Sequence, residues 1–218
     1  MSKEYLQAIQ KKEKYKKENQ IYLKNRVFKT FKNLIKTFYN TELKKNQSLL
    51  DLGSADGVFV NVSKKEGLDA YGLDAHDLDL EDDKIDFSDN RFDIVTAISL
   101  IEHVKNPNNL LKETMRVLKK DGIFILVTPD WSYNVQNFYD DPTHVKPYTK
   151  KSLKFLLESF NFKEVYVVPW LVCKPSWMWK TPFSFLIARN LPFRGNRNKF
   201  IPEFLKGKSK TLLAICKK

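Results

Sequence analysis

The sequence has 218 residues, which is enough for one domain with a full hydrophobic core. None of its apolar runs reaches the roughly 18 residues that a membrane-spanning helix needs, and its start is rich in Lys and Glu. We therefore expect a cytoplasmic protein with no membrane span and no signal region. The two cysteines, Cys173 and Cys216, stand outside any metal or redox motif.

The formal net charge of +12 is unevenly distributed along the chain. Residues 1–45 hold 13 Lys and Arg against 4 acidic residues, residues 46–170 hold 14 against 21, and residues 171–218 hold 11 against 1. Basic ends of this kind are typical either of solvated surfaces or of an anionic partner. The candidate partners are a phospholipid surface at the inner face of a membrane, nucleic acid, or a phosphorylated acceptor.

Two helices are expected before residue 47, over residues 3–20 and 25–39. The second has one apolar stripe, formed by Val27, Phe28, Phe31, Leu34, Ile35 and Phe38. We expect the basic helices of residues 1–47 to pack against a domain of residues 48–218, either on its sheet or over its ligand pocket.

A strand, a loop of small residues and a helix are expected in this order over residues 49–65. Small side chains let a ligand approach the backbone, and the amides at a helix start bind polar or anionic groups. The residues that could form such a nucleotide-type site are Asp51, Gly53, Ala55 and Gly57. Their spacing departs from Gly-x-Gly-x-x-Gly, which argues against a dehydrogenase.

The second strand, residues 70–74, ends in Asp74. Strand, helix and strand in this order predict two parallel strands, and a carboxylate at that strand end can accept both hydroxyls of a ribose. Further strands are expected over residues 92–99, 122–129, 162–168 and 209–216, and helices from Pro107 to Gly122 and after Thr149.

Four segments in order then carry a family resemblance: residues 92–95 (Phe-Asp-Ile-Val), 101–104 (Ile-Glu-His-Val), 118–122 (Leu-Lys-Lys-Asp-Gly) and 126–129 (Leu-Val-Thr-Pro). With the glycine loop, they resemble class I S-adenosylmethionine-dependent methyltransferases over residues 48–168, especially the ubiquinone-biosynthesis and sugar O-methyltransferases. The resemblance implies an α/β fold, a Rossmann-like three-layer sandwich whose mostly parallel sheet has an antiparallel last strand. The region around the third strand is shorter here than is usual in the family.

The same resemblance implies S-adenosylmethionine as the cofactor. The residues expected to bind it are Asp51, Gly53, Ala55, Gly57, Asp74, Asp79, Leu80 and Ser99. Asp79 and the Leu80 amide are expected near the adenine, with Glu81 as the alternative.

Glu102 and His103 form a Glu-His pair that binds metal in some quinone-pathway relatives. Those relatives have a further metal-binding Glu where this chain has Ser99, so we expect no metal here. In the alternative to a metal role, Glu102 caps local backbone and His103 lines the wall of the acceptor pocket.

Residues 130–148 follow a strand end and should lie over the active site. Their Asp-Pro-Thr-His segment resembles one in sugar and glycan members of the family. We expect His144, held by Asp141 or Thr143, to be the general base that takes a proton from an acceptor hydroxyl. In the alternative, His144 only ties the loop down. The other acceptor-side candidates are His103, Trp131 and Tyr148.

Residues 169–208 form an insertion that is rich in aromatic and basic residues. They are Trp170, Trp177, Trp179, Phe183, Phe185, Phe193, Phe200 and Phe204, interleaved with Lys174, Lys180, Arg189, Arg194 and Arg197. Three roles fit this composition: contact with lipid headgroups, stacking on single-stranded RNA, or a lid helix that begins at Thr181 and Pro182 and packs on the domain.

The function predicted first is S-adenosylmethionine-dependent O-methylation of a sugar, a glycan or another small or lipid-linked acceptor. One alternative is an RNA methyltransferase acting on ribose, which the basic ends favour. Another is a non-catalytic module that binds the cofactor and associates with membranes.

Overall fold

The computed structural model of the protein describes residues 17–74, 79–171, 174–181, 183–193, 200–202, 205–206 and 208–218. Most of the helix expected at residues 3–20 lies outside the described residues, as do Cys173, Pro182, Arg194, Arg197 and Phe204. Of the helices that are described, none has the length and apolar character needed to cross a bilayer.

The core of the fold is a six-stranded sheet with the strand order β2-β1-β3-β4-β6-β5. Its strands are β1 (Ser48–Leu52), β2 (Asp69–Leu73), β3 (Phe92–Ile98), β4 (Leu118–Pro129), β5 (Lys163–Pro169) and β6 (Thr211–Lys217). The first four strands run parallel, and β6 runs antiparallel to both of its neighbours. This confirms the expected α/β fold, with a mostly parallel sheet and an antiparallel last strand.

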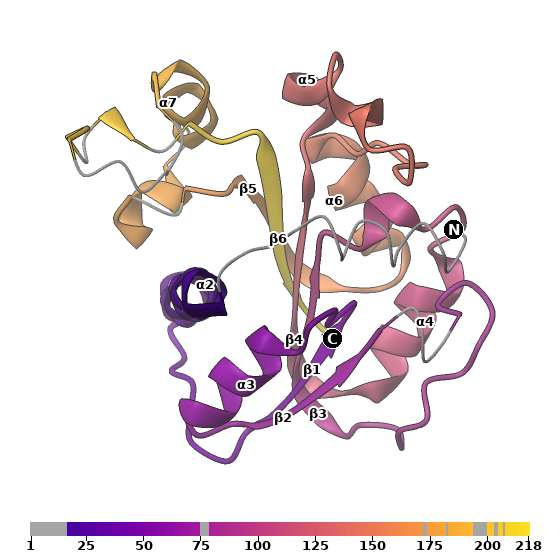
Figure 1. Ribbon diagram of the computed structural model, residues 1–218. Coiled ribbons are helices and arrows are strands. Elements are labelled where there is room, and N and C mark those ends of the chain that lie inside the picture. The colour runs from indigo at the N-terminus through magenta and orange to yellow at the C-terminus, as the bar shows by residue number, and fades with distance from the viewer. Residues whose placement is uncertain are drawn as a thin grey trace.

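Helices cover both faces of the sheet, which gives three layers (Figure 1). One face carries α2 (Lys17–Tyr39) and α3 (Val58–Lys65), and the other carries α4 (Asn108–Val117) and α6 (Lys150–Ser159). Two short helices, α5 (Trp131–Asn134) and α7 (Ser184–Asn190), lie at the end of the molecule where β4 finishes. Short 3-10 helices are η1 (Ile101–His103), η2 (Phe138–Asp140) and η3 (Ser176–Lys180).

α2 is held in place by the apolar stripe that its sequence predicts. The buried members of this stripe are Phe28, Phe31, Leu34, Ile35 and Phe38. The Phe31 ring meets the Phe59 ring of α3 edge-on, with 5.7 Å between the ring centroids. Burying each such side chain contributes about 1.5–3 kcal/mol, so the stripe ties α2 firmly to α3 and the sheet.

The junction between α4 and β4 differs from the prediction. The sequence pattern extends the helix to Gly122, but α4 ends at Val117 and β4 begins at Leu118. Leu118 pairs with Phe92 of β3. An apolar residue followed by two lysines suits the end of a helix as well as a strand, so pairing with β3 decides the boundary.

The helix in the insertion begins later than predicted. α7 starts at Ser184, and the Thr181 hydroxyl donates to the Met178 carbonyl at 2.7 Å instead of capping the helix. The Ser184 amide donates to the Thr181 carbonyl at 3.1 Å. Thr181 therefore closes the preceding turn, η3, rather than opening α7.

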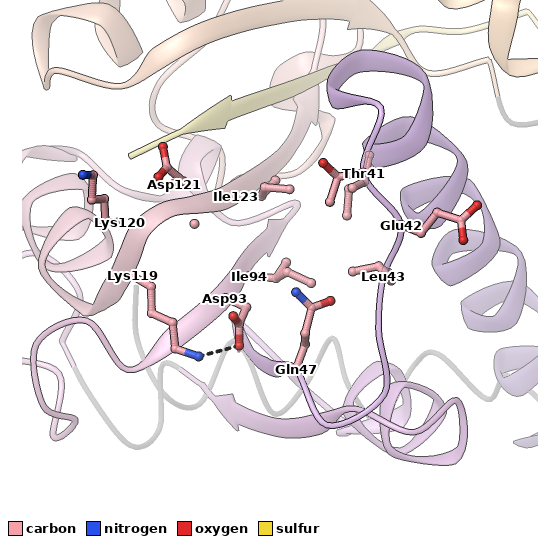
Figure 2. A pocket seen from close by; sticks show the side chains of 12 residues that line it. Thr41, Glu42, Leu43, Gln47, Asp93, Ile94, Lys119, Lys120, Asp121 and Ile123 are labelled. Atoms are coloured by element: carbon pink, nitrogen blue, oxygen red, sulfur yellow. Dashed lines mark hydrogen bonds and ion pairs between the residues drawn. The ribbon is translucent and has the colours of Figure 1, made fainter.

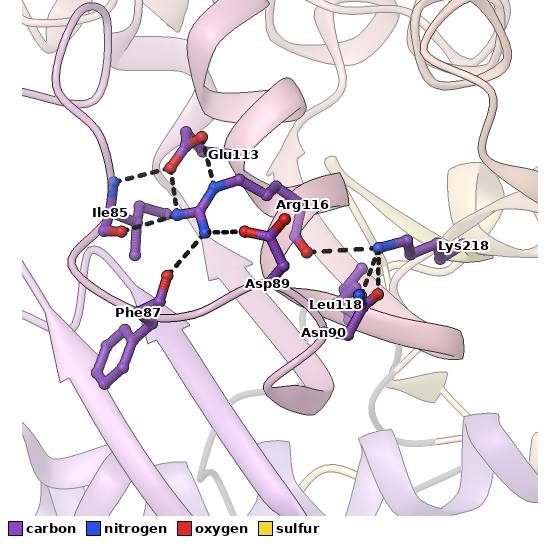
Figure 3. A network of polar contacts seen from close by, with 8 residues as sticks. All are labelled: Ile85, Phe87, Asp89, Asn90, Glu113, Arg116, Leu118 and Lys218. Atoms are coloured by element: carbon purple, nitrogen blue, oxygen red, sulfur yellow. Dashed lines mark hydrogen bonds and ion pairs between the residues drawn. The ribbon is translucent and has the colours of Figure 1, made fainter.

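The segment between β2 and β3 is shortened, as predicted, and Arg116 of α4 holds it (Figure 3). The Arg116 guanidinium donates to the carbonyls of Ile85 and Phe87 and to the carboxylates of Asp89 and Glu113. The Glu113 carboxylate also accepts from the Ile85 amide at 2.8 Å. One side chain thus satisfies backbone groups that a regular strand would pair in a ladder.

We expect Arg116→Met to lower the free energy of unfolding by about 2–4 kcal/mol, because Glu113 and two loop carbonyls lose their charged donor. Urea unfolding followed by circular dichroism measures this loss. The control is Lys112→Met on the exposed side of the same helix, which should change the free energy by less than about 0.5 kcal/mol. Equal stability of the Arg116 variant and the wild type would show that apolar contacts alone hold the segment.

Candidate active site

The carboxyl ends of β1, β2, β3 and β4 meet at one edge of the sheet, because these strands are parallel. The loop after β1 is tied to the end of β2, since the amides of Gly53 and Ser54 both donate to the Leu73 carbonyl, at 2.7 and 3.0 Å. After β3, the Ser99 amide donates to the Val127 carbonyl of β4 at 2.8 Å. Predicted cofactor residues from separate segments therefore share this edge.

The loop after β1 has a backbone that favours small residues. Gly53, Ala55 and Gly57 all have positive φ, at 74°, 48° and 66°. A Cβ at Gly53 would lie 3.0 Å from the Leu100 side chain, whereas a Cβ at Gly57 would meet no protein atom within 4 Å. Gly57 therefore faces open space directly before α3, whose first amides can bind a polar or anionic group.

Asp51 supports this loop from within the sheet. It is buried at the end of β1, opposite Thr96 of β3, and the Thr96 hydroxyl donates to Asp51 Oδ1 at 2.6 Å. Burial raises the pKa of Asp51 to about 6, and the charges of Asp56 and Asp74 add to this rise. Asp74 directly follows Leu73, which pairs with Leu52 of β1, so Asp74 lies at the same edge of the sheet, and it stays the residue predicted to bind a ribose.

The residues predicted near an adenine form a closed turn after β2. Asp79 Oδ1 accepts from the Glu81 amide at 2.9 Å, and the Leu80 side chain is buried in the core. The Glu81 carboxylate accepts from the amides of Lys105 and Asn106, at 2.9 and 3.2 Å. Both acidic side chains thus have partners within the protein, and an adenine contact through either of them stays a prediction.

Glu102 lies completely buried in η1. Its Oε2 accepts from the Thr128 hydroxyl of β4 at 2.9 Å, and burial raises the pKa of the carboxyl to about 7. Glu102 therefore does more than cap local backbone. Within the described part of the chain, Glu102 Oε1 and the Tyr148 hydroxyl have no hydrogen-bond partner.

Tyr148, predicted on the acceptor side, belongs instead to the hydrophobic core. Its side chain is 3% exposed, and burial followed by the charge of Glu102 raises the pKa of its hydroxyl. The sequence position of Tyr148, at the end of the loop of residues 130–148, gives no sign that its side chain is buried. The Tyr148 hydroxyl is buried, and its contact with an acceptor therefore stays a prediction.

His103 is held by Thr143, a residue of the loop after β4. Its Nδ1 lies 2.8 Å from the Thr143 hydroxyl oxygen and 3.1 Å from the Thr143 carbonyl oxygen. The same hydroxyl donates to Asp141 Oδ1 at 2.6 Å, so its oxygen accepts from the Nδ1–H group. Nε2 of His103 therefore keeps the lone pair, and burial lowers the pKa of this imidazole.

His144 lies against His103, with 4.8 Å between the two ring centroids. Its Nδ1 lies 2.6 Å from the Phe138 carbonyl oxygen, which makes Nδ1 the donor and leaves Nε2 with the lone pair in the neutral ring. Asp141 reaches His144 only at 4.0 Å, between Oδ2 and Nε2. Of the two predicted partners, Asp141 thus stays within ion-pair distance of His144, whereas Thr143 pairs with His103, and the Phe138 carbonyl orients His144.

Glu102, His103 and His144 form a group that could hold a metal ion. One ligand atom from each residue lies within 4.8 Å of the other two. Both histidines bond an oxygen through Nδ1, an arrangement that is also common in metal sites. The prediction of no metal rested on Ser99 and did not foresee that a distant loop would bring in His144.

Trp131 opens α5 and forms an aromatic wall beside His144. Its ring meets Phe138 at 5.5 Å and Tyr139 at 5.9 Å between centroids, both edge-on. Phe138 also packs against the His144 ring at 4.6 Å. The predicted acceptor-side residue Trp131 is thus linked to the predicted base through the Phe138 ring.

Three residues of the site escaped prediction. They are Thr96 and Thr128, which bond the buried carboxyls, and Asp130, which caps α5 through the Ser132 amide and whose pKa is raised by burial. A sequence signal exists only for Thr96, because the register of parallel strands places it opposite Asp51.

A pocket of about 120 Å³ lies at the opposite edge of the sheet (Figure 2). It is bounded by the starts of β3 and β4, where Asp93 and Lys119 form an ion pair at 2.7 Å, and by Gln47 and Leu43 before β1. This pocket is remote from the glycine loop and from both histidines. It is therefore not part of the candidate active site.

Comparison with known families decides the class of this domain. A family profile described as "Methyltransferase domain" matches residues 22–167, a stretch that contains the glycine loop and both histidines. The chain belongs to this methyltransferase family. Membership confirms the expectation of an enzyme domain of the S-adenosylmethionine-dependent methyltransferase type.

Solved methyltransferases share the fold. A SAM-dependent methyltransferase from Archaeoglobus fulgidus has a TM-score of 0.60 and 21% identity, over 91% of this chain and 94% of that chain. Phosphoethanolamine N-methyltransferase 2 of Haemonchus contortus, solved with S-adenosyl-L-methionine, has a TM-score of 0.56 and 16% identity, over 85% of this chain and 51% of that chain. At these identities the likeness concerns the fold alone.

Curated relatives cover part of the chain. The ubiquinone biosynthesis O-methyltransferase of Pelagibacter ubique is 26% identical over 125 residues, which are 49% of this chain and 50% of that protein. An uncharacterized protein of Methanocaldococcus jannaschii is 32% identical over 152 residues, 64% of each chain. The chain thus spans between half and about two thirds of the length of these relatives.

The raised pKa of Asp51 predicts a dependence of stability on pH. An acid with a raised folded-state pKa binds its proton more tightly in the folded protein, so ionisation of Asp51 costs stability between pH about 4 and pH about 6. We expect Asp51→Asn, which cannot ionise, to gain about 2–3 kcal/mol relative to wild type over this range.

Urea unfolding at pH values below and above this window measures the gain. The control is Asp82→Asn, an exposed carboxylate, whose difference from wild type should stay constant. A constant difference for Asp51→Asn as well would mean that Asp51 ionises equally easily in the folded and the unfolded chain.

Proposed function

We propose that this protein transfers a methyl group from S-adenosylmethionine to a hydroxyl group of a small acceptor, such as a sugar, a glycan or a lipid-linked glycan. The family match over residues 22–167 is the observation that carries the reaction class. The choice of a hydroxyl acceptor is supported by His144, a candidate base beside the aromatic wall of Trp131.

The cofactor would be held at the carboxyl edge of β1 and β2. Gly57 faces open space before α3. The Val58 amide already donates to Asp56 Oδ1 at 3.1 Å, and the amides that follow it can bind the polar groups of the ligand. Asp74 would accept the ribose hydroxyls. When bound, S-adenosylmethionine supplies an electrophilic methyl group.

His144 would take the proton of the acceptor hydroxyl at Nε2. The Phe138 carbonyl holds Nδ1–H at 2.6 Å, so the neutral ring presents its lone pair at the other nitrogen. Asp141, whose Oδ2 lies 4.0 Å from Nε2, would favour the imidazolium that forms. The Trp131 ring is partly exposed and could pack against the apolar face of a sugar ring.

We expect the purified protein to bind S-adenosylmethionine and S-adenosylhomocysteine, but not NAD, in calorimetric titrations. Asp74→Ala should weaken this binding by about tenfold or more, because two ribose hydroxyls lose a charged acceptor. The matched control is Asp69→Ala at the other end of the same strand, which should bind normally. Normal binding by Asp74→Ala would remove Asp74 from the cofactor site, and a folded wild type that binds neither sulfur cofactor would refute the proposed reaction.

We expect His144→Ala to keep cofactor affinity within about twofold and to lower kcat by about a hundredfold or more, because general-base catalysis typically contributes this much. The assay follows labelled methyl groups from S-adenosylmethionine into glycan and lipid-linked fractions. Asn137→Ala, an exposed residue of the same loop, is the control and should retain the wild-type rate.

The same assay separates a base from a metal ligand. Treatment with a chelator should leave the wild-type rate unchanged if His144 acts as a base. Loss of activity that returns on adding a divalent cation would assign His144 to a metal site with Glu102 and His103 instead. If His144→Ala lowered cofactor affinity as strongly as it lowers kcat, His144 would have a structural role.

A further inference from the structure

One face of the insertion is apolar, basic and exposed. We define this aromatic-basic face by its exposed residues: Trp177 and Lys180 of η3, Phe183 at the N-cap of α7, and Leu186 and Arg189 of α7. The three apolar side chains are 65%, 63% and 58% exposed for Trp177, Phe183 and Leu186. Large apolar side chains gathered on a surface are typical of a site that contacts a partner or a membrane.

The opposite side of the same segment is packed onto the domain. Trp179 is 3% exposed and belongs to the hydrophobic cluster beneath α2, while Ser184 and Ala188 of α7 are buried. The Ser209 amide also donates to the Ala188 carbonyl at 3.2 Å. The buried side anchors η3 and α7, so the aromatic-basic face is a fixed outer surface of the fold.

The segment that carries this face is strongly basic in sequence. Residues 171–218 contain 11 Lys and Arg against a single acidic residue, although Lys217 and Lys218 lie at the far end of β6. Lys180, Arg189 and Lys208 are all exposed. Basic residues around exposed Trp, Phe and Leu side chains match the composition of protein surfaces that bind anionic lipid headgroups and insert side chains below them.

The aromatic-basic face adjoins the acceptor-side loop. The Arg189 guanidinium lies over the Tyr133 ring of α5, 5.6 Å from its centroid. One turn earlier on the same side of α7, the Lys150 ammonium lies 4.4 Å from the centroid of the Phe185 ring. Figure 1 shows α7 and α5 at the same end of the molecule. A surface bound by α7 would therefore lie close to residues 131–148.

We propose that the aromatic-basic face docks the protein onto an anionic phospholipid surface. Phe183 at the N-cap of α7 and Leu186 within it are three residues apart and both exposed, which suits insertion into the boundary between headgroups and acyl chains. Leu186 offers no ring for stacking on a nucleic-acid base, which makes single-stranded RNA the weaker match. The inference does not rest on the proposed methyl transfer, because docking requires neither cofactor nor acceptor.

The test is co-sedimentation of the full chain with vesicles. We expect the partition coefficient for phosphatidylcholine–phosphatidylglycerol vesicles to exceed that for pure phosphatidylcholine by about tenfold or more, and to fall at high ionic strength. Replacing Trp177, Phe183 and Leu186 together by Ser should lower partitioning by about tenfold or more, because the inserted apolar area is lost.

The matched control is Phe155→Ser on α6, which removes an aromatic side chain that is 74% exposed elsewhere on the surface. It should partition like the wild type. If the triple variant does not fold, Lys180→Glu with Lys208→Glu replaces it, with Lys64→Glu on α3 as its control. The charge variant should lose binding to anionic vesicles, and its control should not.

Three results would overturn the proposal. The first is a wild type that does not partition onto anionic vesicles, and the second is equal partitioning onto neutral ones. In the third, the triple variant retains vesicle binding but loses binding to a single-stranded RNA oligonucleotide. That result would assign the face to RNA.

Discussion

The parallel pairing of β1 with β2 and β3 is the constraint on which the candidate site depends. Because these strands run in one direction, the residues that end them collect at one edge of the sheet. The register then sets the detail, since it places Thr96 directly opposite Asp51 and lets a hydroxyl bond a buried carboxyl. The glycine loop rests on this buried pair and on two hydrogen bonds to Leu73.

Arg116 compensates for the short connection between β2 and β3. Its guanidinium gathers two carbonyls and two carboxylates (Figure 3), and its own carbonyl accepts from Lys218 at the end of β6, at 3.4 Å. The Lys218 ammonium also reaches Asn90 and the Leu118 carbonyl, at 2.8 and 2.7 Å. The charged side chains of Arg116 and Lys218 thus bond backbone carbonyls in the segment between β2 and β3 and at the junction of α4 and β4.

The fold and the glycine loop could be predicted because they depend on local pattern. Apolar runs, helix spacing and small residues leave their mark within a few positions, and the loop containing Gly53 and Gly57 is one such case. The partner of His103 could not be predicted, because a hydrogen bond between loops 40 residues apart has no local signature. The bond of His144 to the Phe138 carbonyl spans six residues, but other backbone carbonyls of the loop were equally good candidates. The α4–β4 boundary at Leu118 failed for a related reason, since strand pairing outweighed local helix preference.

The position of β6 between β4 and β5 has a consequence for how this chain can vary. β5 pairs with β6, which follows it in the chain only after the long insertion. The pairing therefore joins strands that are far apart in the sequence. Lengthening such a connection is cheap, because doubling a loop costs about 0.6 kcal/mol. The segment between β5 and β6 is therefore where evolution can remodel what the domain touches, while the edge formed by β1, β2 and β3 keeps its geometry.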